Sequence, residues 1–241
     1  MDSIIWDEES NNYTRRGSQN GQLDLYREKA NRLWMVNEFL KVINELMPSP
    51  ESILDVGCGY GGTIKELFNQ YPSTKFIGID PGTESIAIAK ENIDGKNVEL
   101  KVGYSHQLDF PEETFDIVNL CMVLQWVPRK YLIRTMAEVD RVLKFGGLIY
   151  INEFLPNKPV VSQSNHNKDV YIFKNDYSLF FSTYPWYKEI YRFVIKTEEG
   201  EDQQRYTSVI RKFNIEEVYT LKDSVTDIRE GSSLDNYPPN W

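Results

Sequence analysis

The residues best suited to chemistry are an acid and the glycines that follow it, in the segment ILDVGCGYGG at positions 53–62. One pattern here is G-x-G-x-x-G, a turn that approaches the pyrophosphate of a dinucleotide, formed by Gly57, Gly59 and Gly62. The other is D-x-G-x-G-x-G, formed by Asp55, Gly57, Gly59 and Gly61. The first pattern predicts hydride transfer and the second predicts methyl transfer, so the neighbouring residues must decide between them.

Asp55 favours the second pattern because of its charge. A carboxylate fixed at the end of a buried strand gains little beside a pyrophosphate, whereas it stabilises a ligand with a sulfonium and an ammonium group. Asp80 ends the next apolar run, KFIGID. From that place a carboxylate can accept both hydroxyls of an adenosine ribose, whichever of the two cofactors carries it. Together the two acids favour the second pattern without excluding the first.

Short apolar runs alternate with amphipathic segments along the first two thirds of the chain. The pattern predicts strands at 52–57, 75–80, 98–102, 115–120 and 148–152, and helices at 23–47, 63–69, 83–92 and 129–144. The first of these helices is long enough to be two. Strands that alternate with helices are typical of βαβ units and indicate a parallel sheet covered on both faces. Ligands of such sheets bind beyond the carboxyl ends of the strands.

The last third of the chain breaks this alternation. Residues 160–169 are predicted to form a polar connector, and residues 171–191 hold nine aromatic side chains. That is more than a small covering layer needs, so we expect some of them to line an acceptor pocket. Two β-rich runs, at 189–197 and 205–213, flank an acidic turn and predict an antiparallel hairpin.

Composition limits the partners and the compartment. A formal net charge of -9 without a concentrated basic run predicts that nucleic acid is not a partner. The sequence has no apolar run of about 18 residues and starts with acidic residues, unlike a signal peptide. We therefore expect a cytoplasmic protein with no membrane partner. Cys58 and Cys121 are expected to be small core residues, and the few cysteines and histidines show no metal-ligand spacing.

Two further blocks decide between the cofactors. The segment GYSHQLDFPEETFDIVNLCMVLQWVP at 103–128 and the segment EVDRVLKFGGLIYINEF at 138–154 follow ILDVGCGYGG and GID in order. These four motifs, over residues 50–155, resemble those of class I S-adenosylmethionine-dependent methyltransferases of the type 11 kind. The resemblance implies an α/β fold with a Rossmann-like, seven-stranded, mainly parallel sheet, helices on both faces and an antiparallel C-terminal hairpin.

The resemblance also implies one methyltransferase domain over residues 1–241. Residues 1–50 would form an N-terminal helical cap or lid, 51–155 the cofactor-binding core, and 156–241 the acceptor-pocket segment and hairpin. The chain departs from the family at Tyr104, where many relatives have an acid that contacts the adenine amino group. It also has Asp109 and Phe145 where relatives have proline.

The family's roles can be carried over residue by residue, with S-adenosylmethionine as the cofactor. The glycine turn would line the methionine and ribose moieties, Asp80 would hold the ribose hydroxyls, and the end of the fourth strand would lie near the methionine end and the acceptor. The implied cofactor-binding residues are Asp55, Gly57, Cys58, Gly59, Gly61, Asp80, Pro81, Ser105, His106, Asn119, Leu120 and Gln125, with Tyr13 and Arg16 as parts of a lid.

The expected reaction is transfer of the methyl group to an oxygen or nitrogen of a small-molecule acceptor by in-line displacement. The protein then mainly aligns donor and nucleophile and excludes water. A general base is needed only if the nucleophile loses a proton, and His166 and Glu153 are the candidates. Two alternatives stay open: other chemistry with the same cofactor, and a catalytically inert cofactor-binding or partner-binding subunit.

Overall fold

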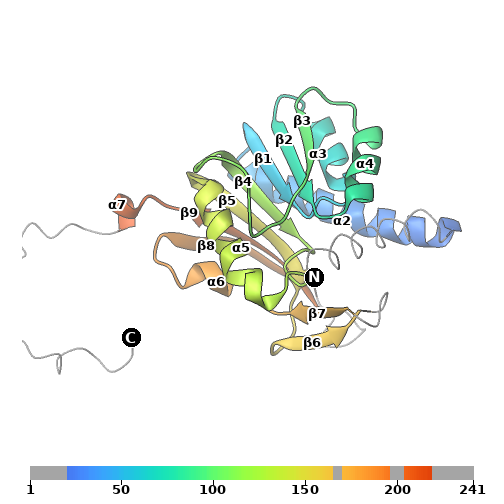
Figure 1. The fold of residues 1–241 in the computed structure, drawn as a ribbon. Helices are drawn as coiled ribbons and strands as arrows, with labels where there is room; N and C mark the ends of the chain where they lie inside the picture. Colours follow the sequence, from blue (N-terminus) through green and yellow to red (C-terminus); the bar gives the residue numbers. More distant parts are fainter. Residues whose placement is uncertain (1–20, 165–169, 196–203, 219–241) are drawn as a thin grey trace, which may run out of the picture.

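A seven-stranded sheet forms the centre of the molecule in the computed structural model, which describes residues 21–164, 170–195 and 204–218 (Figure 1). The strand order is β3-β2-β1-β4-β5-β9-β8. Strand β9 runs antiparallel to both of its neighbours, while the pairs from β3 to β5 are parallel. The strands are β1 (Ser52–Val56), β2 (Lys75–Asp80), β3 (Val98–Val102), β4 (Phe115–Cys121), β5 (Leu143–Phe154), β8 (Tyr187–Ile195) and β9 (Arg205–Lys212). The expected sheet and its antiparallel hairpin are confirmed.

Helices cover both faces of the sheet (Figure 1). Helices α2 (Gly21–Leu46), α3 (Gly62–Gln70) and α4 (Thr83–Asn92) pack on one face. Helices α5 (Arg129–Val142) and α6 (Leu179–Ser182) pack on the other. Because both faces are covered, all five residues of β1 are buried, including Ser52 and Asp55 as well as the apolar Ile53, Leu54 and Val56. The short helix α7 (Ile215–Val218) follows β9.

The N-terminal segment forms one continuous helix, α2, which is the first of the two predicted possibilities. Two boundaries differ from the sequence prediction. Helix α5 ends at Val142 and the chain enters β5 at once, because Leu143 pairs with Phe115 before a bulge with Gly146 at φ 77°. The glycines therefore bend a strand rather than end a helix. The hairpin's first strand begins at Tyr187 instead of 189, and residues 196 and 197 lie outside the described ranges.

The predicted polar connector is also partly wrong. Its first residues form β6 (Val160–Gln163), which pairs with β7 (Tyr171–Lys174) in a separate two-stranded sheet. In β6 the exposed and partly buried residues alternate, which a strand with one covered face allows despite its polar side chains. Within the aromatic segment that follows, Tyr177, Phe181 and Tyr187 belong to the core, whereas Tyr171 and Tyr184 are about half exposed.

One carboxylate holds together the amino ends of three strands. Asp116 Oδ2 accepts hydrogen bonds from the backbone nitrogens of Glu51 (2.8 Å) and Ser52 (2.9 Å), at the start of β1. Its Oδ1 lies 2.8 Å from Lys144 Nζ on β5. Burial acts to raise the pKa of Asp116, but the hydrogen bonds from Lys144 and Ser52 outweigh burial and lower it. Asp116 therefore fixes the register of the strands that carry the glycine turn.

No helix among the described residues is long and apolar enough to cross a membrane.

Replacing Asp116 with alanine should lower the free energy of unfolding by roughly 2–3 kcal/mol, because it leaves backbone donors without their charged acceptor. Urea unfolding at pH 7 measures the change. The matched control is Asp109→Ala, which removes an exposed carboxylate and should leave stability unchanged. Equal stability of the two variants would show that Asp116 is not an anchor of the sheet.

Candidate functional site

The glycine turn between β1 and α3 has a backbone that only glycine adopts easily. Gly57, Gly59 and Gly61 have φ values of 74°, 52° and 79°. A Cβ atom on Gly57 would also lie 2.6 Å from the Val123 side chain, in the loop after β4. The nitrogens of Gly57 and Cys58 both donate to the carbonyl of Ile79 on β2, which holds the turn against the neighbouring strand.

Asp80, at the end of β2, holds the other side of the turn. Its Oδ2 accepts a hydrogen bond from Gly59 N (2.9 Å), and its Oδ1 accepts one from Gly82 N (2.8 Å). The side chain is buried. A Cβ atom on Gly59 would meet no atom within 4 Å, so the space beside the turn is open at this point. A ligand can therefore approach the backbone next to a fixed carboxylate.

Asp55 and Asn119 are paired residues of β1 and β4 and lie on the same face of the sheet as α2. Asn119 Nδ2 donates to Asp55 Oδ1 at 2.7 Å. Asp55 Oδ2 and Asn119 Oδ1 are buried and have no hydrogen-bond partner among the described residues. Burial, together with the charge of Asp80, raises the pKa of Asp55 to about 7, although the Asn119 hydrogen bond acts to lower it. These two oxygen atoms could accept hydrogen bonds from a cationic donor such as an ammonium group.

Glu153, near the end of β5, binds the loop that follows β4. Its Oε1 accepts hydrogen bonds from Leu124 N (2.6 Å) and Gln125 N (3.4 Å). Met122, at the start of this loop, has a φ of 56°, so the loop turns sharply out of the strand. Glu153 is fully buried, and its Oε2 has no hydrogen-bond partner in the ranges that the structure describes. Burial raises its pKa to about 8, although the backbone donors and Arg129 act to lower it.

Arg129, at the start of α5, joins this loop to the segment that follows β5. Its guanidinium donates to the carbonyls of Leu124 (2.8 Å) and Val127 (3.1 Å), and to Tyr177 Oη (3.0 Å). Its Cζ also lies 4.4 Å from the centre of the Phe173 ring, on β7. Because Phe173 N donates to the carbonyl of Gln125, the small sheet is fastened to the loop from two directions.

Several side chains that were predicted to contact the cofactor contact other residues of the protein instead. Ser105 Oγ lies 3.0 Å from Thr135 Oγ1, and His106 stacks on Tyr131 with ring centres 4.1 Å apart. Leu120 is buried in the core on the α5 side. Cys58 packs beside Gly78, whose added Cβ would lie 2.9 Å from the sulfur. Any contact of Leu120 or Cys58 with a ligand would be through the backbone.

Of the remaining predicted residues, Gln125 is buried and Pro81 is half-buried beside Asp80. Tyr13, Arg16 and His166 lie outside the described residues. The two cysteines are both free thiols.

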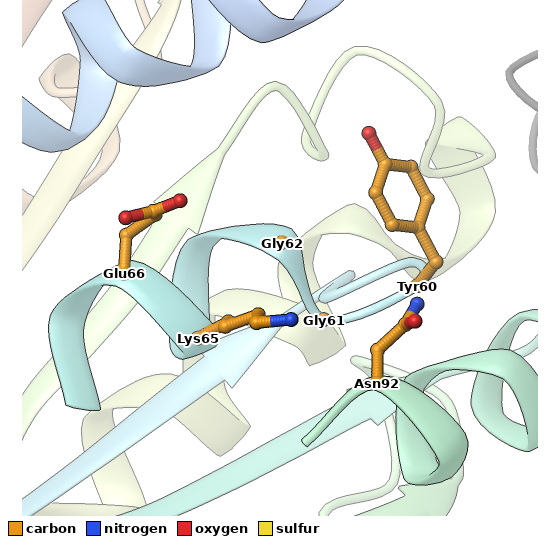
Figure 2. Close-up of a pocket in the computed structure, with 6 residues that line it drawn as sticks. All are labelled: Tyr60, Gly61, Gly62, Lys65, Glu66 and Asn92. Atoms are coloured by element: carbon orange, nitrogen blue, oxygen red, sulfur yellow. The ribbon is translucent and has the colours of Figure 1, made fainter. Parts of the chain in front are cut away.

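A small pocket of about 160 Å³ lies on the α3 and α4 side of the turn (Figure 2). Figure 2 shows the Lys65 and Asn92 side chains reaching toward Gly61, while the Tyr60 ring extends away. Neither Asp55 nor Asp80 lines this pocket. Its volume is below the roughly 300 Å³ of small-molecule sites, so it is not the predicted cofactor site.

Sequence patterns did not reveal the polar residues that lie on the same face of the sheet as Asp55, on rungs nearer the carboxyl ends of the strands. Cys121, Asn152 and Thr207 share one rung of β4, β5 and β9, and Phe154 pairs with Arg205 further along. The available signal was the alternation of β5, which puts residues 150, 152 and 154 on one face. The partner strand β9 was not assigned to β5 from the sequence.

The fold and the site define a protein class, because the strand order, the single antiparallel strand and the turn between two strand-end acids occur together in class I methyltransferases. Residues 53–147 match the sequence model of a family described as methyltransferase domain. The chain is 37% identical over 113 residues to an uncharacterized methyltransferase of Schizosaccharomyces pombe, covering 43% of this chain and 40% of that one.

Other relatives carry more specific names. A demethylmenaquinone methyltransferase of Thermotoga maritima is 30% identical over 108 residues, covering 45% of each chain. A tRNA N(3)-methylcytidine methyltransferase of Drosophila melanogaster is 29% identical over 135 residues, covering 51% of this chain and 42% of that one. These matched segments span less than half of the relatives' own length.

Solved structures agree on the fold. A SAM-dependent methyltransferase of Methanosarcina mazei superposes with a TM-score of 0.59 at 22% identity, covering 71% of this chain and 97% of that one. The [4+2]-cyclase SpnF superposes with a TM-score of 0.59 at 15% identity, covering 73% and 81%. Over residues 53–147 the chain therefore resembles a methyltransferase domain, and it shares the fold of S-adenosylmethionine-dependent methyltransferases, whose cofactor is S-adenosylmethionine.

Asp55→Asn should raise stability at neutral pH. Because the pKa of Asp55 is higher in the fold than in the unfolded chain, its ionisation opposes folding. This cost is absent below about pH 4, grows between pH 4 and pH 7, and reaches on the order of 3–4 kcal/mol above pH 7. The asparagine keeps the bond from Asn119 and has no charge to bury.

Urea unfolding at pH 4 and pH 8 measures this effect. The variant should be more stable than the wild type at pH 8, with the difference narrowing at pH 4. Asp109→Asn, at an exposed position, serves as the control and should show no such trend. A variant that is less stable at pH 8 would contradict the electrostatic description of Asp55.

Proposed function

We propose that the protein transfers a methyl group from S-adenosylmethionine to an oxygen or nitrogen of a small-molecule acceptor. The observation that carries the proposal is the placement of two buried strand-end carboxylates, Asp55 and Asp80, on either side of one glycine turn. S-adenosylmethionine has a sulfonium and an ammonium group at one end and ribose hydroxyls in the middle, and these match the two acids in order.

Each side chain has a defined part in this proposal. Asp80 accepts the ribose hydroxyls, and the backbone of Gly57 to Gly61 lies along the methionine moiety. The bare oxygens of Asp55 and Asn119 accept the ammonium group. The cofactor supplies an electrophilic methyl carbon. The protein's task is then to fix the direction of attack and exclude water, for which the anchored loop after β4 supplies one wall.

The charge of the chain supports a small acceptor over a nucleic acid. One relative is named a tRNA methyltransferase, yet this chain has a formal net charge of -9, which repels a polyanion. A second candidate, other chemistry with the same cofactor, has its support in the structural likeness to a protein named a cyclase. Incubation with labelled S-adenosylmethionine and a set of small alcohols, phenols and amines separates the two, because only methyl transfer labels the acceptor.

Calorimetry with S-adenosylhomocysteine tests the cofactor site directly. Asp80→Ala should weaken binding by about 5- to 150-fold, because it removes charge-assisted hydrogen bonds worth roughly 1–3 kcal/mol. Glu66→Ala removes a carboxylate from the pocket on the α3 side and should bind as the wild type does. Equal affinity of Asp80→Ala and wild type would place the ribose elsewhere, and no heat with the wild type at millimolar ligand would contradict the proposed function.

Two variants distinguish whether Glu153 is a general base or a positioning residue. We propose the positioning role, because Oε1 receives the loop's backbone donors and Oε2 is buried. Glu153→Gln keeps an acceptor oxygen, so kcat should stay within about tenfold, whereas Glu153→Ala should raise KM as the loop loosens. Steady-state kinetics with a labelled acceptor measures both constants. If Glu153 is the base, Glu153→Gln should lose at least about a hundredfold in kcat and the limb of the pH–rate profile near pH 8.

A further inference from the structure

Arg205 is a cation placed at the acceptor end of the site. It is the first residue of β9, and because β9 is antiparallel, this residue lies at the carboxyl edge of the parallel strands. It pairs with Phe154, and its guanidinium carbon lies 5.3 Å from the centre of the Phe154 ring. Lys174 Nζ, from β7, lies 4.4 Å from the same ring centre. Two positive groups therefore flank one aromatic ring in a chain of formal net charge -9.

In the part of the chain that the structure describes, the guanidinium of Arg205 has no hydrogen bond or ion pair. Other arginines of the same end are occupied: Arg129 binds backbone carbonyls, and Arg192 pairs with Asp176 and Glu189. A half-buried guanidinium with five donors and only a ring face beside it is suited to an anion.

Arg205 is close enough to the methyl-transfer region to act there. Cys121 ends β4 two strands away, on the rung that also holds Asn152 and Thr207. From the strand spacing and the two-residue step to Arg205, the Cα atoms are about 12 Å apart, and a long arginine side chain covers much of that distance. The pKa of the Cys121 thiol is raised, first by burial and then by Asp55 and Glu153, and Arg205 acts in the opposite direction. Arg205 pairs with Phe154, and residues 150, 152 and 154 share one face of β5, so Arg205 lies on the face of the sheet that carries Asn152 and Cys121.

The rung of Cys121 also holds a buried polar atom without a partner among the described residues. Asn152 Nδ2 donates to Thr207 Oγ1 at 2.9 Å, while Asn152 Oδ1 makes no hydrogen bond in that part of the chain. Asn152 is completely buried. An unpartnered buried polar atom is costly, so Asn152 Oδ1 indicates a place where a polar ligand completes the hydrogen bonding.

We infer that the methyl acceptor is a small anion, whose carboxylate or phosphate group is bound by Arg205 over the Phe154 ring. Its nucleophilic atom then lies toward Cys121, next to the methionine end of the cofactor, with Asn152 and Thr207 along its length. The inference rests on the proposed function, since it assigns the substrate class of the same site. Asp55 and Arg205 lie on the same face of the sheet, on strands β1 and β9. On this inference Asp55 selects the cationic cofactor and Arg205 selects the anionic acceptor.

Matched neutral and charged probes test this inference without knowledge of the natural acceptor. The probes are benzoate with benzamide, and acetate with acetamide, titrated into the protein saturated with S-adenosylhomocysteine and followed by amide NMR shifts. The acids should bind at least about tenfold more tightly than the amides, a factor expected of a charge-assisted hydrogen bond. The shifts should centre on Asn152, Phe154, Arg205 and Thr207.

Two variants locate the effect. Arg205→Gln should lose the preference for the acids, while Lys188→Gln, which removes an exposed positive charge from the neighbouring strand, should keep it. Both variants should bind S-adenosylhomocysteine as the wild type does. Equal binding of acids and amides, no saturable binding of either acid, or a preference that survives Arg205→Gln would overturn the inference. Loss of S-adenosylhomocysteine binding by the wild type would instead overturn the proposed function.

Discussion

The site depends on two carboxylates that the fold buries close together. Asp55 and Asp80 end neighbouring strands, and the charge of Asp80 adds to burial in raising the pKa of Asp55. Such an arrangement costs stability in the absence of a cation. It is tolerated because Asp116 fixes the strand starts and because backbone nitrogens of the turn bind Asp80. On the proposed function, a cationic cofactor would remove this cost when it binds beside Asp55.

The side-chain charge also changes across the carboxyl edge of the sheet, from acidic at β1 and β2 to cationic near Phe154. Acids dominate at β1 and β2, neutral amides and a hydroxyl occupy β4, β5 and β9, and cations gather around Phe154 at the end of β5. The loop after β4 lies between these regions and is held by Glu153 and Arg129 rather than by its own hydrogen bonds alone. Donor and acceptor would thus meet where the charge along the edge changes sign. In-line attack requires such an alignment.

Local patterns predicted much of this fold because the relevant signals are short-range. The apolar runs of β2 and β3 gave their bounds without error. The acids at the ends of β1 and β2 are buried beside the glycine turn, as the strand pattern predicted, and their role in ligand binding stays a prediction. The prediction was wrong at Gly146, because glycines occur both after the end of a helix and at a bulge in a strand. Here they form a bulge in β5. Strand β6 was missed because its polar residues are tolerated by a small sheet with one exposed face.

The rest of the candidate site could not be predicted from the sequence, because it depends on pairing between strands that are far apart in the chain. Arg205 stands 51 positions after Phe154 in the sequence, and only the antiparallel register of β9 on β5 brings their side chains together. Glu153 looked like a candidate base because it follows a strand, and its contacts with Leu124 and Gln125 depend on a loop that no periodicity predicts. These residues come together only through the pairing of the strands, so no local sequence motif predicts their contacts.

A crystal structure with bound S-adenosylhomocysteine tests the central claim most directly. The account predicts both ribose hydroxyls within hydrogen-bond distance of the Asp80 carboxylate, and the amino group beside the bare oxygens of Asp55 and Asn119. The sulfur should then face Cys121 and the loop after β4. A ligand with its ribose away from Asp80, or with its amino group away from Asp55, would contradict the account.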